Sequence, residues 1–287
     1  MQVHLWGRQY LFLVILLLVV VNIFIFQKVL SPRVLTVSVL NIGQGDAILV
    51  RGPTGITMLV DGGPDRAVLR ELGAVLPVGQ RRIDAVVETH PDRDHVGGLP
   101  DVFANYEVKH FLEPGIPNDT NAAAALTSAA YAEPDLVQIV ARRGMRLNLG
   151  GSAYADILFP DRDVSKVETN DGSIVMRLVY GKTSFMLTGD LAAPIEEWLL
   201  VLDKDDGELQ SDVLKAGHHG SKYSTSAAWL ATLNPAIVAI SVGARNSYGH
   251  PTPETLSRVK DEGAIVYRTD KEGRLVFTSD GVNVYKK

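Results

Sequence analysis

Short apolar runs alternate with helix-compatible stretches along most of the chain, and this pattern predicts an α+β protein. The predicted strands are residues 35–40, 47–51, 57–60, 83–89, 108–112, 155–159, 174–180, 183–187, 213–216, 236–242 and 265–268, with a hairpin at 274–284. The predicted helices are residues 67–76, 99–105, 121–132, 194–202, 227–233 and 253–260. Because strands and helices interleave without a continuous βαβ rhythm, the pattern favours a mixed sheet with helices outside it.

The N-terminal end is different, since residues 10–26 form an apolar run interrupted only by Asn22. As a helix this run would be about 25 Å long, a little short of the roughly 30 Å hydrocarbon core of a bilayer. Trp6 and residues 29–30 can extend it, so we expect residues 1–33 to be an uncleaved, single-span membrane anchor with its juxtamembrane segment. A cleaved signal peptide is less favoured because no small-x-small cleavage site follows. A buried core helix is less favoured because the run is hydrophobic all round.

Composition limits the remaining part, residues 34–287, in which we see no interior linker and therefore expect one domain. The hydrophobic content of 46% is enough for a sizeable core. The absence of cysteine excludes disulfides and thiolate metal sites, so any metal must be bound by His, Asp, Glu or Asn. All 33 acidic residues but only 25 of the 28 basic residues lie after residue 33, an acidic excess that argues against tight nucleic-acid binding.

The candidate chemistry begins at residues 90–95, where two histidines and two aspartates share one predicted strand-to-helix turn. Imidazole nitrogen and carboxylate oxygen are the ligands that Zn²⁺ or Mn²⁺ takes. A solvated polar loop would explain one or two such residues but explains four of them poorly. The turn therefore predicts part of a metal site, with His90, Asp92, Asp94 and His95 as candidate ligands.

Further candidate ligands follow other predicted strands. Asp61 comes after residues 56–60, Asp190 after residues 184–187, and His218 and His219 after residues 212–217. Taken singly, an aspartate in such a position is more often a turn former or a helix cap. Their recurrence at strand ends favours a metal centre presented on the loops of a rigid sheet.

Together these motifs resemble those of the metallo-β-lactamase superfamily. More narrowly, the segments Asn41–Ala47, Lys215–Ser221 and Tyr248–Pro251 resemble the ComEC competence-protein type, and the resemblance runs from about residue 34 to 285. Asp92 stands where the wider superfamily has the second histidine of His-x-His-x-Asp-His, and Asn170-Asp171 lies where a third-motif histidine is usual. The ComEC type is similar in both respects. The resemblance implies an αββα sandwich of two mixed β-sheets with external helices.

The resemblance also implies two divalent metal ions that generate hydroxide near neutral pH. The expected ligands are His90, Asp92 and Asp190 for one ion and Asp94, His95, Asp190 and His218 for the other, with Asp190 bridging and Asp94 counted among the catalytic residues. The choice between His218 and His219 stays open, with His218 preferred because it comes first after the strand. Asp92 adds a hard oxygen ligand, which favours Mn²⁺ or Mg²⁺ over Zn²⁺ relative to an all-histidine site.

Several other residues are candidates for roles around the metals. Asp61 would orient a ligand histidine by accepting its other ring N–H. His250 would protonate a leaving oxygen or hold a phosphate, unless it is a loop histidine without a role. Lys215 and Ser221 would contact an anionic substrate, or only fix strand register and cap a helix. The remaining candidates near the metals or substrate are His219, Asn170, Gln44 and Asp46.

The ComEC resemblance implies a membrane-anchored phosphodiesterase or nuclease that acts on DNA, in an extracytoplasmic domain. The positive-inside bias alone is weak, with Arg8 before the apolar run and Lys28 and Arg33 after it. Because the chain has one apolar span, we expect either a free-standing relative of the ComEC type or a partner of a separate channel protein. A hydrolase of small-molecule or cell-envelope esters and a non-catalytic tethered binding module are the alternatives, and a β-lactamase is the least favoured because two motif histidines are missing.

Overall fold

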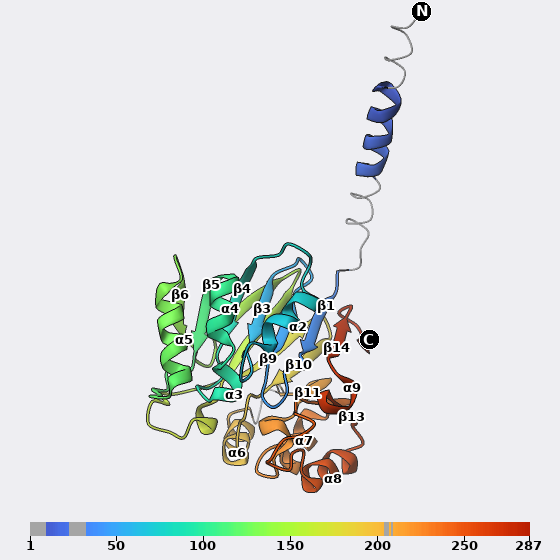
Figure 1. Cartoon of the computed structure of the whole chain (residues 1–287). Coiled ribbons are helices and arrows are strands. Elements are labelled where there is room, and N and C mark those ends of the chain that lie inside the picture. Colours follow the sequence, from blue (N-terminus) through green and yellow to red (C-terminus); the bar gives the residue numbers. More distant parts are fainter. Residues whose placement is uncertain (1–9, 23–32, 204–206, 208) are drawn as a thin grey trace, which may run out of the picture. The chain divides into compact units, whose positions relative to one another are not determined.

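The computed structural model describes residues 10–22, 33–203, 207 and 209–287 (Figure 1). Internal contacts divide the chain into two compact units, Met1–Arg33 and Val34–Lys287. In the first unit, residues 10–22 form a helix whose apolar side chains are exposed. None of the described helices combines the length and hydrophobicity needed to cross a bilayer. The rest of the predicted anchor, residues 1–9 and 23–32, lies outside the described residues.

The second unit contains two mixed β-sheets. The first sheet has eight strands in the order β15-β14-β1-β2-β3-β4-β5-β6. Their bounds are β1 Leu35–Val39, β2 Ile48–Arg51, β3 Thr57–Val60, β4 Arg82–Val87, β5 Glu107–Glu113, β6 Val137–Val140, β14 Leu275–Ser279 and β15 Val284–Lys286. Strands β3 to β6 are parallel to one another, and the other neighbours pair antiparallel.

The second sheet has seven strands in the order β13-β12-β11-β10-β9-β8-β7. Their bounds are β7 Arg146–Gly150, β8 Ala153–Phe159, β9 Val175–Tyr180, β10 Thr183–Leu187, β11 Val213–Lys215, β12 Ile237–Ile240 and β13 Ile265–Arg268. Strands β10 to β13 are parallel, and β7 to β10 pair antiparallel.

Apolar side chains cover both faces of each sheet. Between the sheets lies one core, to which Val60 and Val87 contribute from the first sheet and Phe185 and Leu187 from the second. A second core lies under helices α2 Ala67–Val75, α4 Leu99–Asn105 and α5 Asn121–Ala132, and a third under α6 Ala193–Leu202, α7 Ala227–Leu233 and α8 Pro253–Asp261. The predicted pair of mixed sheets with external helices is confirmed.

The predicted elements are present, several with the predicted bounds and the others with ends that differ by one or two residues. The edge strands β6 and β7 were not predicted, and neither were the short helices α3 Arg93–Val96, α9 Thr269–Glu272, η1 Asn170–Gly172 and η2 Gly217–Gly220. Three of the four residues of β6 are exposed, so its sequence lacks the buried apolar run that marks the inner strands.

The parallel parts of the two sheets position the polar residues. Strands β3 and β4 are parallel neighbours in one sheet, and β10 and β11 are parallel neighbours in the other. Asp61 directly follows β3, Thr89 and His90 follow β4, Asp190 follows β10, and the histidine pair follows β11. In an open α/β sheet, ligands bind in the crevice outside the carboxyl ends of the strands.

Candidate metal centre

The turn after β4 buries both of its histidines. The His90 and His95 side chains are fully buried, and their ring centroids lie 4.0 Å apart. Nδ1 of His90 lies 3.0 Å from the Thr89 hydroxyl, and Nδ1 of His95 lies 2.8 Å from Asp61 Oδ2. Each ring therefore has one nitrogen engaged by its surroundings, which leaves Nε2 as the nitrogen available to a metal.

Asp61 is a buried residue that connects two strands and a histidine. Its carboxylate accepts hydrogen bonds from the Thr89 backbone N–H at 2.8 Å and from the Thr89 hydroxyl at 2.7 Å, in addition to its contact with His95. Its backbone is left-handed, with φ 58°, a conformation that aspartate tolerates better than most residues. The side chain is thus fixed on the side of His95 that faces away from Asp190, since Nε2 of His95 lies 3.3 Å from Asp190 Oδ1.

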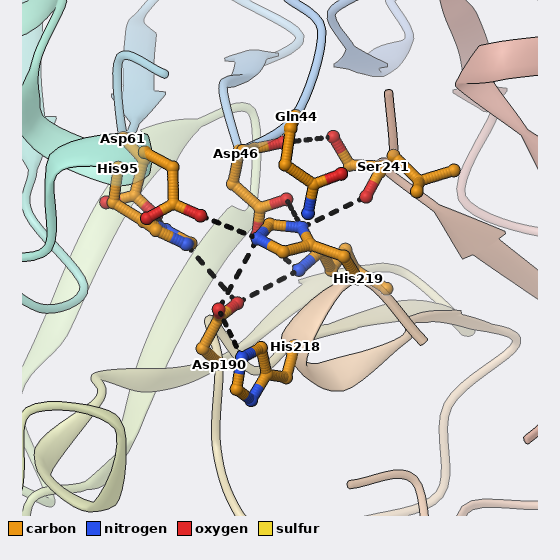
Figure 2. Close-up of polar contacts among 12 residues, drawn as sticks. Gln44, Asp46, Asp61, His95, Asp190, His218, His219 and Ser241 are labelled. Atoms are coloured by element: carbon orange, nitrogen blue, oxygen red, sulfur yellow. Dashed lines mark hydrogen bonds and ion pairs between the residues drawn. The ribbon is translucent and has the colours of Figure 1, made fainter. Parts of the chain in front are cut away.

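Asp190 is at the middle of the group (Figure 2). It follows the left-handed Gly189 and is 2% exposed. Its second carboxylate oxygen lies 3.4 Å from Nε2 of His219 and 3.7 Å from Nε2 of His218. Burial alone would raise the pKa of Asp190, but His219 and His95 outweigh it and hold the pKa well below its usual range.

The two adjacent histidines after β11 point to different places. Both have left-handed backbones, with φ 48° and 53°, and their rings stand 79° apart. His219 is 1% exposed, with Nδ1 3.0 Å from the Ser241 carbonyl oxygen and Nε2 3.3 Å from Asp94 Oδ2. The His218 side chain is 31% exposed. The structure thus gives His219 the buried position next to Asp190 that sequence reasoning preferred for His218.

Four residues could hold a divalent cation with one atom each. Their ligand atoms lie within 4.8 Å of one another, and the residues are Asp94, His95, Asp190 and His219. Nε2 of His90 lies outside this group but only 3.8 Å from Asp92 Oδ2. A second set of three, Asp46, Asp61 and His95, lies on the other side of the His95 ring.

Unpaired polar atoms support a cation at this place. Within the part of the chain that the structure describes, Nε2 of His90, His95 and His219 and Oδ1 of Asp190 are buried without a hydrogen-bond partner. Leaving one such group unpaired costs about 1–3 kcal/mol, and buried polar groups are rarely left so. Two of these imidazole nitrogens, those of His95 and His219, lie with the carboxylates of Asp94 and Asp190 in a group that fits a divalent metal ion.

The histidines differ in charge. Burial and the neighbouring His95 lower the pKa of His90 to about 3, so its ring is neutral at pH 7 and able to bind a metal. For His219, burial favours the neutral ring, but Asp190 and Asp46 outweigh it and raise the pKa to about 9. A metal must therefore displace a proton from His219, which makes metal binding dependent on pH.

Lys215 and Asp46 form a buried ion pair beside the centre. Both side chains are almost fully buried and are in direct contact, and Lys215 Nζ also donates to the Gly189 carbonyl oxygen at 3.2 Å. Burial alone would raise the pKa of Asp46, but Lys215 and His219 lower it below its usual range. Because Lys215 and the 3% exposed Ser221 are buried, neither takes the substrate-facing position that sequence reasoning considered.

The loop that carries Asp46 packs directly on the turn after β4. The Asp46 N–H donates to the Asp94 carbonyl oxygen at 3.1 Å, and a Cβ on Gly45 would lie 2.1 Å from that same oxygen. Only glycine fits here, which explains the Gln-Gly-Asp sequence. Gln44, the residue before Gly45, accepts a hydrogen bond at its Oε1 from the Gly243 N–H at 3.1 Å.

A cavity of about 160 Å³ opens onto the acidic side chains. Asp92, Asp94 and Asp190 line it, together with Gln44, His218, His219, His250 and Tyr248. Burial, His218 and His219 lower the pKa of His250. Asn170 does not line the cavity, but it follows Thr169, whose side chain hydrogen-bonds to Asp92, and its own Oδ1 is buried without a partner among the described residues.

Three residues of this site were missed from the sequence. Thr89 and Ser241 contact ring nitrogens, and Tyr248 lines the cavity. Thr89 immediately precedes the cluster and Tyr248 belongs to a motif, so both had a signal. Ser241 is an ordinary residue after β12, and nothing local in the sequence marks it.

Known proteins resemble this chain in sequence and in fold. The Metallo-beta-lactamase superfamily profile matches residues 40–243. "ComE operon protein 3" of Bacillus subtilis is 30% identical over 84% of the chain, and "Competence protein ComA" of Neisseria gonorrhoeae is 31% identical over 84%. The chain spans only 32% of the length of either relative.

Solved structures agree on the fold. The metallo-beta-lactamase fold protein YhfI of Bacillus subtilis matches 82% of this chain and 96% of its own, with a TM-score of 0.53 and 12% identity. Igni18, a metallo hydrolase from Ignicoccus hospitalis, matches 84% of this chain and 98% of its own, with a TM-score of 0.52 and 17% identity. Fold, motifs and relatives agree: the chain belongs to the metallo-β-lactamase superfamily, and its relatives include competence proteins of the ComEC type.

Proposed function

We propose that this protein is a metal-dependent phosphodiesterase that cleaves DNA. The observation that supports it most is that Nε2 of His95 and of His219, both buried without a hydrogen-bond partner among the described residues, face the Asp190 carboxylate, while the equally buried Nε2 of His90 lies near Asp92. Such a set has no evident structural use, because each unpaired atom destabilises the fold. A superfamily hydrolase fold with this ligand set is suited to hydrolysis at a metal centre.

We propose that the centre takes two divalent ions. Asp94, His95, Asp190 and His219 would hold one, and His90 and Asp92, with Asp190 shared, would hold the other. When bound, the ions would activate water and stabilise negative charge on the attacking and leaving oxygens. This assignment replaces His218, the first choice from sequence, by His219. The oxygen-rich set favours Mn²⁺ or Mg²⁺ over Zn²⁺.

The surrounding residues orient the ligands. Asp61 accepts a hydrogen bond from the Nδ1–H of His95, and the Ser241 carbonyl oxygen accepts one from the Nδ1–H of His219, so both rings present Nε2 to the centre. The Thr89 hydroxyl donates a hydrogen bond to Asp61 and lies 3.0 Å from His90 Nδ1. His250, whose pKa is lowered, is a poor proton donor above neutral pH, and we assign it to hydrogen-bond a phosphate oxygen.

DNA is proposed as the substrate because relatives carry competence names and one is named "Recombination protein 2". We further propose that residues 1–33 anchor the chain in a membrane with the domain outside, and that the domain acts with a channel protein that conducts the DNA, as the competence names of the relatives suggest. Because the domain has an excess of acidic residues, which repel DNA, we expect its contacts with the DNA phosphates to be confined to the site.

The first test uses the full chain, stripped of metal and supplemented with Mn²⁺, Mg²⁺ or Zn²⁺. Cleavage of end-labelled single- and double-stranded DNA is compared with cleavage of p-nitrophenyl acetate and a β-lactam, with Asp94→Asn as the matched control. Metal-dependent DNA cleavage that the variant lacks supports the proposal. Ester hydrolysis without DNA cleavage would replace it with a small-molecule or envelope esterase, and bound metal with neither activity would indicate a binding module.

The membrane proposal has its own test. The full chain and a chain lacking residues 1–33 are mixed with liposomes and separated by flotation. Flotation of the full chain alone supports an anchor in this segment. Equal behaviour of the two chains would contradict it.

A further inference from the structure

An exposed aromatic ring borders the proposed catalytic cavity. Tyr248 lines the cavity with Asp92, Asp94 and Asp190, yet its side chain is 68% exposed. One face of its ring stacks on His250, with centroids 5.8 Å apart and planes 26° from parallel. About two thirds of the residue is therefore open to solvent beside the site.

The loop that carries Tyr248 is held in place by side-chain hydrogen bonds. The Asn246 amide donates to the carbonyl oxygens of Gly243 at 2.9 Å and His250 at 2.8 Å, and its Oδ1 accepts from the His250 N–H at 3.0 Å. Gln44, from the loop before β2, accepts from the Gly243 N–H. The ring therefore lies on a fixed loop, and His250 further limits its rotation.

The size of the cavity determines what lies against this ring. At about 160 Å³ the cavity is smaller than the roughly 300–1,000 Å³ of pockets that enclose a whole organic ligand. It can take a phosphate group beside the carboxylates and histidines. The sugar and base attached to that phosphate must then lie outside it, along the rim where Tyr248 is exposed.

We propose that Tyr248 stacks on an unpaired base next to the scissile phosphate, and that the preferred substrate is therefore single-stranded nucleic acid. The inference rests on the proposed phosphodiesterase function and specifies its substrate. Every base offers a π-face to an aromatic side chain, so stacking binds single strands without sequence preference. In a duplex both faces of each base are already stacked on neighbours, so the ring can be used only after the base is displaced.

Exposure alone would not distinguish Tyr248 from other surface tyrosines. Tyr131 on α5 is 90% exposed, but it neither lines the cavity nor stacks on a ring among the described residues. Tyr131→Ala is therefore a matched control for loss of an exposed tyrosine, and Tyr248→Phe keeps the ring while removing the hydroxyl.

The test measures kcat and KM of the full chain, loaded with Mn²⁺, on two end-labelled single strands. One is an ordinary oligonucleotide. The other has the same length but carries abasic sites in place of its nucleotides, so it keeps the phosphates and lacks the bases. We expect Tyr248→Ala to raise KM for the ordinary strand roughly tenfold, with little change in kcat, and to leave the abasic strand unaffected. Tyr248→Phe keeps the ring and should raise KM for the ordinary strand much less than Tyr248→Ala does, and Tyr131→Ala should behave as wild type on both strands.

Other results would overturn the inference. Equal losses by Tyr248→Ala on the ordinary and abasic strands would mean that the tyrosine supports the loop and does not contact bases. Wild-type cleavage of duplex as efficient as cleavage of single strands would also overturn it. In both cases DNA is still cut and the proposed function stands, whereas no cleavage of any strand by wild type removes both proposals.

Discussion

Two groups of buried residues lie along the same strands and differ in composition. Between the sheets, the core is mainly apolar and includes Val60 and Leu187. Directly beyond these two residues, at the carboxyl ends of their strands, the buried side chains become ionisable, with Asp61 and Asp190 almost fully buried. Core side chains complete one another's packing, whereas the ionisable group contains buried atoms with no hydrogen-bond partner among the described residues.

The difference separates stability from function. Apolar burial stabilises the fold by roughly 25 cal/mol per Å² and needs no further component. Buried, unpaired nitrogen and oxygen atoms destabilise it unless something binds them. We therefore expect the core to determine whether the protein folds and the ionisable group to determine what it does, with a cation as the missing partner. Substitutions in the core should lower stability and leave the activity of the folded protein nearly unchanged. Substitutions in the ionisable group should lower activity and leave the stability of the metal-free protein nearly unchanged.

The largest effect is expected for Asp94→Asn. The change removes a proposed ligand charge from a side chain that is 35% exposed, so packing is kept. We expect kcat/KM for DNA to fall by at least about a thousandfold, equivalent to about 4 kcal/mol of transition-state stabilisation. The melting temperature of the metal-free protein, measured by circular dichroism, should change little. A variant that keeps a tenth of wild-type activity would exclude Asp94 from the centre.

Phe185→Ala tests the other group. Phe185 lies in β10 and is 1% exposed in the core between the sheets, five residues before Asp190. Truncation should lower the free energy of unfolding in urea by about 3–5 kcal/mol through lost burial and a residual cavity. The fraction that remains folded should keep near-wild-type kcat. If kcat falls with stability nearly unchanged, the two groups are not separable in the way proposed.

The inner elements of the fold were predictable from the sequence because they are strongly patterned. Strand β10 and helix α5 were predicted with the bounds that the structure has, the first from a continuous apolar run and the second from consecutive alanines. Strand β7 was missed because it lies at a sheet edge and only one of its five residues, Leu149, is fully buried, so it has no continuous apolar run. Edge strands owe their conformation to pairing with a neighbour, which local sequence does not encode.

The candidate site was predictable in its residue types and less so in its geometry. The cluster at 90–95 and the aspartates at strand ends predicted a metal centre, because many residues of metal-binding types follow the predicted strands. Which histidine of the pair is buried depends on two consecutive left-handed residues, His218 and His219, and no sequence rule predicts that conformation for histidine. Ser241 joins the site only through tertiary contact.

Metal binding at the ionisable group should stabilise the whole fold, and metal removal should abolish that stabilisation. A ligand that binds only the folded state adds about 2.7 kcal/mol at a hundred times its dissociation constant and about 4.1 kcal/mol at a thousand times. We expect Mn²⁺ to raise the unfolding free energy of wild type by such an amount and to do so equally in Phe185→Ala. The gain should be much smaller in Asp94→Asn. Equal stabilisation of all three proteins, measured by urea unfolding with and without chelator, would place the metal elsewhere.

Glu88 offers the smallest and most selective test, because it is a buried acid whose pKa is shifted by burial and by two other acids among the described residues. It follows Val87 of the core and is 8% exposed. Burial, followed by the charges of Glu113 and Asp61, raises its pKa to about 8 from an ordinary value of 4.5. Between these values the unfolded chain releases the proton and the folded protein keeps it. The folded state therefore binds more protons, and stability falls as pH rises.

Glu88→Gln keeps the volume of the side chain and removes this titration. The unfolding free energy of wild type relative to the variant should fall by about 1.4 kcal/mol for each pH unit between pH 6 and pH 7, and should level off above pH 8. Other titrating groups, the ligand histidines among them, are common to both proteins and cancel in the difference. A difference independent of pH would mean that Glu88 is already ionised at pH 6 and that a cation compensates it. The ionisable group would then include Glu88 and extend to the cavity that Glu88 lines together with residues of α5.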